Sequence, residues 1–100
     1  MARIAGFDWV PAPVPGLPYR DDDHAWKILW HSTETPPSRG AAARLSRVHR
    51  NPPQLWVDPS NRERVQGIDT APAGRPLKAS PGVETHRGRG LPIALLGDAA

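Results

Sequence analysis

Hydrophobic residues in this chain gather in three short runs, at positions 26–30, 55–57 and 91–96. Each run is bounded by proline, glycine or polar residues, and each is shorter than the roughly ten residues of a buried helix, so each predicts a buried strand. The first run is apolar apart from Lys27, a composition typical of a strand in the middle of a sheet. Pro92 places the beginning of the third strand near that residue, because proline cannot donate a hydrogen bond to the ladder.

A hairpin and one helix complete the predicted elements. Segments 54–58 and 63–66 flank a turn that contains proline, serine and asparagine, which predicts two antiparallel strands. Ser38 can cap a helix that runs to position 50, where an asparagine and two prolines end it. The helix carries an apolar stripe of Ala41, Leu45 and Val48, which needs a partner in the core. We expect this stripe to pack on four strand residues: Ile28, Trp30, Leu55 and Val57.

The first 25 residues differ from the rest of the chain. Proline recurs at every second or third position between 11 and 18. Because proline lacks an amide donor and restricts its neighbour, neither a helix nor a central strand is expected there. We predict a proline-rich extended arm over 1–25 and one small domain over 26–100. The predicted fold class is α/β, with a small mixed β-sheet and one main helix packed on a face, and 38% hydrophobic residues indicate a thin core.

Charge and cysteine content narrow the classes of function. The net charge of +3 comes with many arginines, which could attract nucleic acid, an anionic membrane or the acidic bacterial wall. A solvated arginine-rich surface explains the same composition, so nucleic acid is not expected as a partner. The absence of cysteine excludes disulfides and a thiolate zinc site. We expect no membrane span, because no apolar run approaches about 20 residues, and no signal peptide, which predicts a cytoplasmic chain as synthesised.

His31 directly follows the first apolar run and is the clearest chemical candidate. A histidine at a strand end is held on a rigid element and can face a cleft, as a catalytic zinc ligand requires. A hydrogen-bonded structural histidine explains the same pattern. Ser32 is not expected to act with it as a nucleophile, because adjacent strand residues point to opposite faces. Other residues could in principle complete a metal site, although none has ligand spacing: His24, His49, His86, Glu34, Asp58, Glu84 and Asp98.

Several short motifs occur in a recognisable order along the chain. They are WKILWHSTE at 26–34, NPPQLWVDP at 51–59, VET at 83–85 and IALLG at 93–97, after an opening MARIAGFD. Together they resemble the zinc N-acetylmuramoyl-L-alanine amidases, the peptidoglycan-cleaving family that includes phage endolysins and peptidoglycan recognition proteins. The actinobacterial or actinophage type is the most similar. The resemblance covers most of residues 1–97 and rests on the order and spacing of individually weak motifs.

The resemblance implies an amidase-type fold that hydrolyses the amide bond between N-acetylmuramic acid and L-alanine with a zinc-activated water. It places the first zinc ligand at His31 and substrate contacts at Thr33, Glu34 and Gln54. It further implies zinc as the cofactor, peptidoglycan as the partner and a monomeric protein. A phage-type lysin would be released to the cell wall.

The sequence departs from the family pattern at the residues that carry the chemistry. The other two zinc ligands, a histidine and an aspartate or cysteine, lie in the family beyond the strand that matches 93–97, and they have no counterpart here. Ala94 stands where many members carry a glutamate, and Pro53 stands where others carry a tyrosine. We therefore expect the N-terminal half of such a domain, from a truncated gene or a degraded prophage copy, with activity in doubt. The alternatives are a non-catalytic small basic protein that binds cell-wall polymer or nucleic acid, and a largely disordered remnant.

Overall fold

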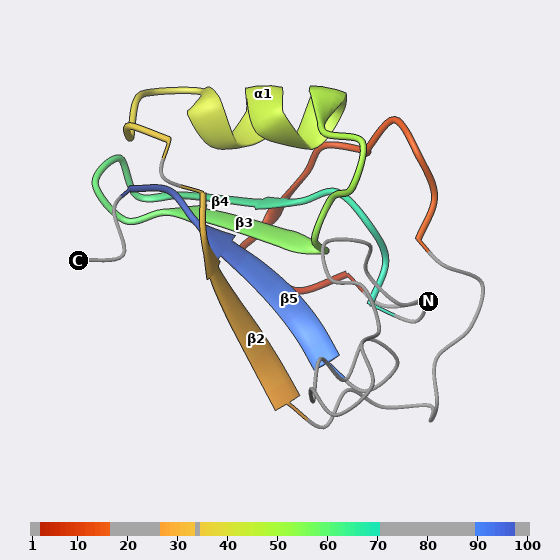
Figure 1. Cartoon of the computed structure of the whole chain (residues 1–100). Coiled ribbons are helices and arrows are strands. Elements are labelled where there is room, and N and C mark those ends of the chain that lie inside the picture. The colour runs from red at the N-terminus through yellow and green to blue at the C-terminus, as the bar shows by residue number, and fades with distance from the viewer. Residues whose placement is uncertain (1–2, 17–26, 34, 71–89, 98–100) are drawn as a thin grey trace.

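One sheet and one helix make up the described part of the chain, which in this computed structural model covers residues 3–16, 27–33, 35–70 and 90–97 (Figure 1). The sheet has five strands in the order β1-β4-β3-β5-β2. The pair β3–β4 is antiparallel, whereas β1–β4, β3–β5 and β2–β5 are parallel. A mixed α/β sheet with one helix is confirmed. The elements are β1 (Asp8–Trp9), β2 (Lys27–Ser32), α1 (Ala41–Val48), β3 (Leu55–Asp58), β4 (Glu63–Gln66) and β5 (Gly90–Leu95).

The predicted hairpin is confirmed as β3 and β4. Asp58 ends β3 with a fully buried side chain, whose carboxylate accepts hydrogen bonds from the backbone N–H of Asn61 at 3.2 Å and from its Nδ2 at 2.7 Å. These bonds close the turn locally, as aspartate commonly does. Arg62 completes the turn at a φ of 55° and returns the chain into β4. The hairpin thus forms from local chemistry that the sequence displays.

The expectation that the 26–30 run forms a central strand is wrong. β2 lies at an edge of the sheet, and β5 lies between β2 and β3 (Figure 1). Ile28 and Trp30 are 55% and 61% exposed on the face that alternation places opposite His31. An apolar run identifies a strand, but it carries no information about which strands flank it. The same exposure removes Ile28 and Trp30 from the predicted partners of the helix.

Helix α1 packs on β3 and β4 and does not extend over β5 and β2 (Figure 1). Ala41 and Ala42 are buried, and their small side chains let the helix approach the sheet. The facing strand residues are Trp56 and Val65, which stand opposite each other in the β3–β4 register. Burying these apolar surfaces stabilises the fold by roughly 25 cal/mol per Å² removed from water. The β5–β2 half of the same sheet face remains outside the cover of the helix.

The helix is shorter than predicted and presents a different stripe. It begins after Gly40, which has a φ of 76°, rather than after Ser38. The Gly40 N–H donates to both carboxylate oxygens of Glu63 on β4, at 2.9 and 3.2 Å, so a neighbouring strand caps this end. Val48 is 68% exposed, and Ser46 is fully buried in its place. The buried stripe of the helix differs from the predicted one because the Ser46 hydroxyl donates a hydrogen bond to the half-buried Val10 carbonyl, and a serine was not expected in the core.

The N-terminal segment runs along β4 and adds the short strand β1. Ser46 Oγ donates to the Val10 carbonyl at 2.6 Å, while the N–H groups of Val10 and Ala12 donate to Gln66 and Gly67 at 3.0 Å each. Positions 11, 13 and 15 are exposed prolines. Proline has no backbone N–H, and at these alternate positions no N–H is needed for pairing with the sheet. A Cβ on Gly67 would collide with Ser46 Oγ, so glycine permits this close approach. The described part of the predicted arm is thus joined to the sheet.

Replacing Ser46 with alanine should detach the N-terminal segment from the helix. We expect the free energy of unfolding to fall by about 1–3 kcal/mol, because the Val10 carbonyl loses its donor in a part-buried place. Urea denaturation measures the change. Ser60→Ala, at an exposed turn position, is the control and should stay within about 0.5 kcal/mol of the parent chain. Equal stability of the two variants would contradict this attachment.

Candidate functional site

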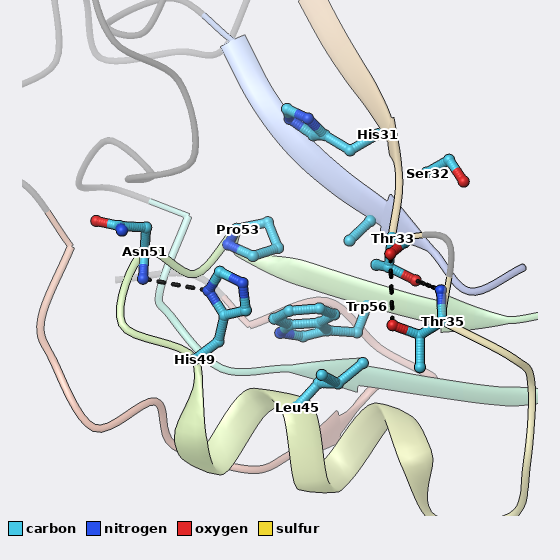
Figure 2. A pocket seen from close by; sticks show the side chains of 10 residues that line it. His31, Ser32, Thr33, Thr35, Leu45, His49, Asn51, Pro53 and Trp56 are labelled. Atoms are coloured by element: carbon cyan, nitrogen blue, oxygen red, sulfur yellow. Dashed lines mark hydrogen bonds between the residues drawn. The ribbon is translucent and has the colours of Figure 1, made fainter.

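A pocket of about 280 Å³ lies on the part of the sheet face that α1 leaves uncovered (Figure 2). Its walls come from the end of β2, the middle of β5 and β3, the end of α1 and the loop before β3. The lining residues are His31, Ser32, Thr33, Thr35, Leu45, His49, Asn51, Pro53, Trp56 and Ala94. Among these described residues there is no lysine, arginine, aspartate or glutamate. The pocket therefore combines uncharged polar groups with apolar surface.

Sheet register brings three of the lining residues together. His31 on β2 stands opposite Ala94 on β5, and Ala94 stands opposite Trp56 on β3. Residues in register on neighbouring strands point to the same face, so these three side chains form one row. All three residues of the row line the pocket, and Ala94 contributes only a methyl group to it.

His31 enters this row from the end of β2, where hydrogen bonds hold the strand. The Thr33 N–H donates to the Leu95 carbonyl at 3.0 Å, and Ser32 Oγ donates to the Gly97 carbonyl at 2.6 Å. Ser32 points away from His31 (Figure 2), so the two side chains do not form a nucleophile and base pair. Burial lowers the pKa of His31 below its ordinary value of 6.5, because a partly desolvated imidazolium is disfavoured. His31 is therefore neutral at neutral pH.

His49 faces the same pocket from the end of α1. Its Nδ1 accepts a hydrogen bond from the Asn51 N–H at 3.2 Å, and its ring contacts Trp56 edge-on, with centroids 5.6 Å apart. The sequence indicated His49 only as one of several residues that could in principle complete a metal site. His49 reaches the pocket because α1 ends above this part of the sheet. The position of the helix on the sheet cannot be predicted from the sequence around His49. Trp56 was likewise visible only as a core residue.

The three residues predicted to contact a substrate lie in different places in the structure. Thr33 lines the pocket, and its Oγ1 accepts a hydrogen bond from the Thr35 N–H at 3.1 Å. Gln54 is fully buried beside the hairpin, where its backbone carbonyl accepts a hydrogen bond from the Gly67 N–H at 3.0 Å, and it does not line the pocket. Glu34 lies outside the described residues. Contacts of these three residues with a substrate stay predictions.

The described residues do not fit a complete catalytic zinc site. Such a site needs about three protein ligands and an open position. His31 and His49 are the two metal-ligating side chains among those that line the pocket, and no group of three such residues occurs in the described ranges. Asp58 is bonded to Asn61 at the hairpin turn instead. The remaining candidates fall outside the described residues: His24, His86, Glu34, Glu84 and Asp98.

Comparison with known proteins assigns no relative: the chain matches no family model, no curated protein and no solved structure. Within residues 3–16, 27–33, 35–70 and 90–97, no helix is long and apolar enough to cross a membrane.

Lower pH should destabilise the fold through His31. Its folded-state pKa lies below its unfolded value, so the unfolded chain binds this proton more readily. The stability that neutral His31 contributes is fully present above the unfolded pKa and is lost as pH falls through the folded pKa. We expect the free energy of unfolding, measured by urea denaturation, to fall less in His31→Gln than in the parent chain when the pH is lowered from about 7.5 to about 5. Parallel pH profiles for the two proteins would refute the lowered pKa.

Proposed function

We propose that this chain is the N-terminal half of an amidase-type domain and that its pocket binds peptidoglycan fragments without cleaving them. The observation that carries the proposal is the position of His31. The residue that the resemblance makes the first zinc ligand ends an edge strand, is neutral, and directs a buried Nε2 to a pocket of about 280 Å³. A binding pocket with a few convergent polar groups is the usual form of a ligand site.

Two positions argue for binding without hydrolysis. Ala94 and Pro53, which occupy the places of proton-transferring residues in related proteins, both line this pocket. Neither side chain can give or take a proton. Proton transfer to the leaving group is worth about 10²–10⁴-fold in rate, so its loss alone would suppress turnover. His31 would orient a bound group, and Leu45, Pro53 and Trp56 would exclude water from it.

A non-catalytic basic protein that binds wall polymer is the second candidate. Four arginines in and around α1 are exposed: Arg39, Arg44, Arg47 and Arg50. They lie on or beside the helix that covers the sheet, and the wall polymers of bacteria carry negative charge. Such attraction would weaken with salt, because exposed charges are screened. Binding of muropeptides that persists at high salt would therefore point to the pocket rather than to this arginine surface.

The isolated chain should bind zinc weakly. Zinc affinity depends on several deprotonated ligands that act together, and the pocket supplies two imidazoles. We expect a dissociation constant weaker than about 1 μM in isothermal titration. Tight stoichiometric binding that disappears in His31→Ala would mean that further ligands complete the site.

The chain should release no stem peptides from purified peptidoglycan, although it should bind soluble muropeptides that contain N-acetylmuramoyl-L-alanine. New N-terminal L-alanine over time measures cleavage, and perturbation of the NMR signals of pocket residues measures binding. Trp30→Phe changes an exposed tryptophan on the other sheet face and serves as the binding control. Zinc-dependent release that is lost in His31→Ala, or failure of muropeptides to perturb the pocket, would overturn the proposed function.

A further inference from the structure

The outer side of β2 carries backbone groups that no described residue pairs with. Among the described strands β2 pairs with β5 alone (Figure 1), and the Thr33 N–H donates to the Leu95 carbonyl, so the backbone of Thr33 faces β5. Backbone groups alternate in direction along a strand, so those of Ile28 and Trp30 face away from β5. Their N–H and carbonyl groups therefore form an edge that can hydrogen-bond a further strand.

The side chains of the same two residues are apolar and largely exposed. Ile28 is 55% and Trp30 is 61% exposed, on the sheet face opposite His31. Native edge strands generally avoid such surfaces by carrying charged residues, proline or a bulge. Residues 28–33 contain no lysine, arginine, aspartate, glutamate or proline. The edge thus offers backbone hydrogen bonds and apolar surface to one and the same added strand.

The opposite edge of the sheet is closed to such an addition. There the N–H groups of Val10 and Ala12 donate inward, to the carbonyls of residues 66 and 67. The alternate residues, which face outward, are Pro11 and Pro13. Proline has no N–H to give to an added strand. A chain in which β2 of each copy pairs with this edge of the next would lack donors, so an open filament is disfavoured.

We propose that the outer edge of β2 binds a second copy of this chain, with the two β2 strands antiparallel about a two-fold axis at Leu29. In this register Ile28 of each copy stands opposite Trp30 of the other, and each such pair exchanges two N–H to carbonyl hydrogen bonds. The axis keeps all four side chains on one face, where β-branched and aromatic pairs stabilise antiparallel strands. The pair of chains forms one continuous sheet, and both of its outer edges carry the prolines. This assembly differs from the monomer that the resemblance implies.

Charge and size favour a second copy over a charged partner. The strand is uncharged over residues 28–33, so an acidic or basic partner would gain no ion pair there. The net charge of +3 on each copy opposes association at low salt and is screened at high salt. A strand of six residues is about 20 Å long, and such a small contact is typical of transient complexes, which bury less than about 1,200 Å². We therefore expect a dissociation constant between about 10 μM and about 1 mM.

Sedimentation velocity of the full chain, from about 10 μM to about 1 mM protein, measures the association. We expect a monomer–dimer equilibrium that strengthens when sodium chloride is raised from about 50 mM to about 500 mM, because the like-charged copies then repel each other less. A chain that stays monomeric over this range overturns the proposal and leaves the edge to a different occupant. Species larger than a dimer, or association that weakens with salt, overturn it as well.

Variants with matched charge locate the contact. Trp30→Lys should weaken association at least tenfold, because it replaces both apolar pairs with a charge. Val48→Lys adds the same charge on α1, at an apolar residue that is 68% exposed, and should leave association unchanged. Undiminished association of Trp30→Lys, or an equal loss in Val48→Lys, overturns the proposal.

A mixed sample tests the register without any substitution. One half of the protein is isotope-labelled, and filtered nuclear Overhauser spectra then report contacts between copies alone. We expect contacts between the Ile28 methyl groups of one copy and the Trp30 ring of the other, at a protein concentration where sedimentation shows a dimer. A dimer without these contacts overturns the proposal. The inference does not rest on the proposed function, because the pocket and these two side chains lie on opposite faces of the sheet.

Discussion

The parallel pairing of β5 with both β2 and β3 is the constraint on which the rest of the structure depends. It places His31, Ala94 and Trp56 in one row, although they lie up to 63 positions apart in sequence. β5 is the shared neighbour of the two strands, and its residue in this row, Ala94, is small and buried. The helix covers β3 and β4 and stops short of β5. The pocket therefore depends on the order of the strands together with the loop before β3, which supplies Asn51 and Pro53.

A second close approach holds the N-terminal segment in place. Ser46 on the helix, Val10 in the segment and Gly67 after β4 meet at one point, where Ser46 Oγ is hydrogen-bonded to the Val10 carbonyl. Helix α1 is thereby linked to the N-terminal segment, which pairs with β4 at the edge of the sheet away from the pocket. On the pocket side, two buried polar atoms, His31 Nε2 and Trp56 Nε1, have no hydrogen-bond partner among the described residues. The residues of the N-terminal attachment do not line the pocket.

Local chemistry accounts for what the sequence could predict. The hairpin follows from turn residues that hydrogen-bond within a few positions, and the histidine at the end of β2 follows from one apolar run. The order of the strands and the rotation of the helix could not be predicted, because both depend on contacts between distant segments. Ser46 shows the reason: a serine on a helix is commonly exposed, and only the nearby Val10 carbonyl makes its burial favourable. His49 and Trp56 were missed as pocket residues on the same ground.

Position 94 decides whether this row of side chains can include an acid. If the proposed amidase relationship holds, a glutamate would often stand at this position, and register would set its carboxyl group between His31 and Trp56. Burial without a positive partner raises the pKa of a carboxyl group, which suits it to transfer a proton near neutral pH. Alanine carries no such acid, while the imidazole of His31 and the indole of Trp56 remain on either side of it. This row therefore holds no carboxyl group that could transfer a proton.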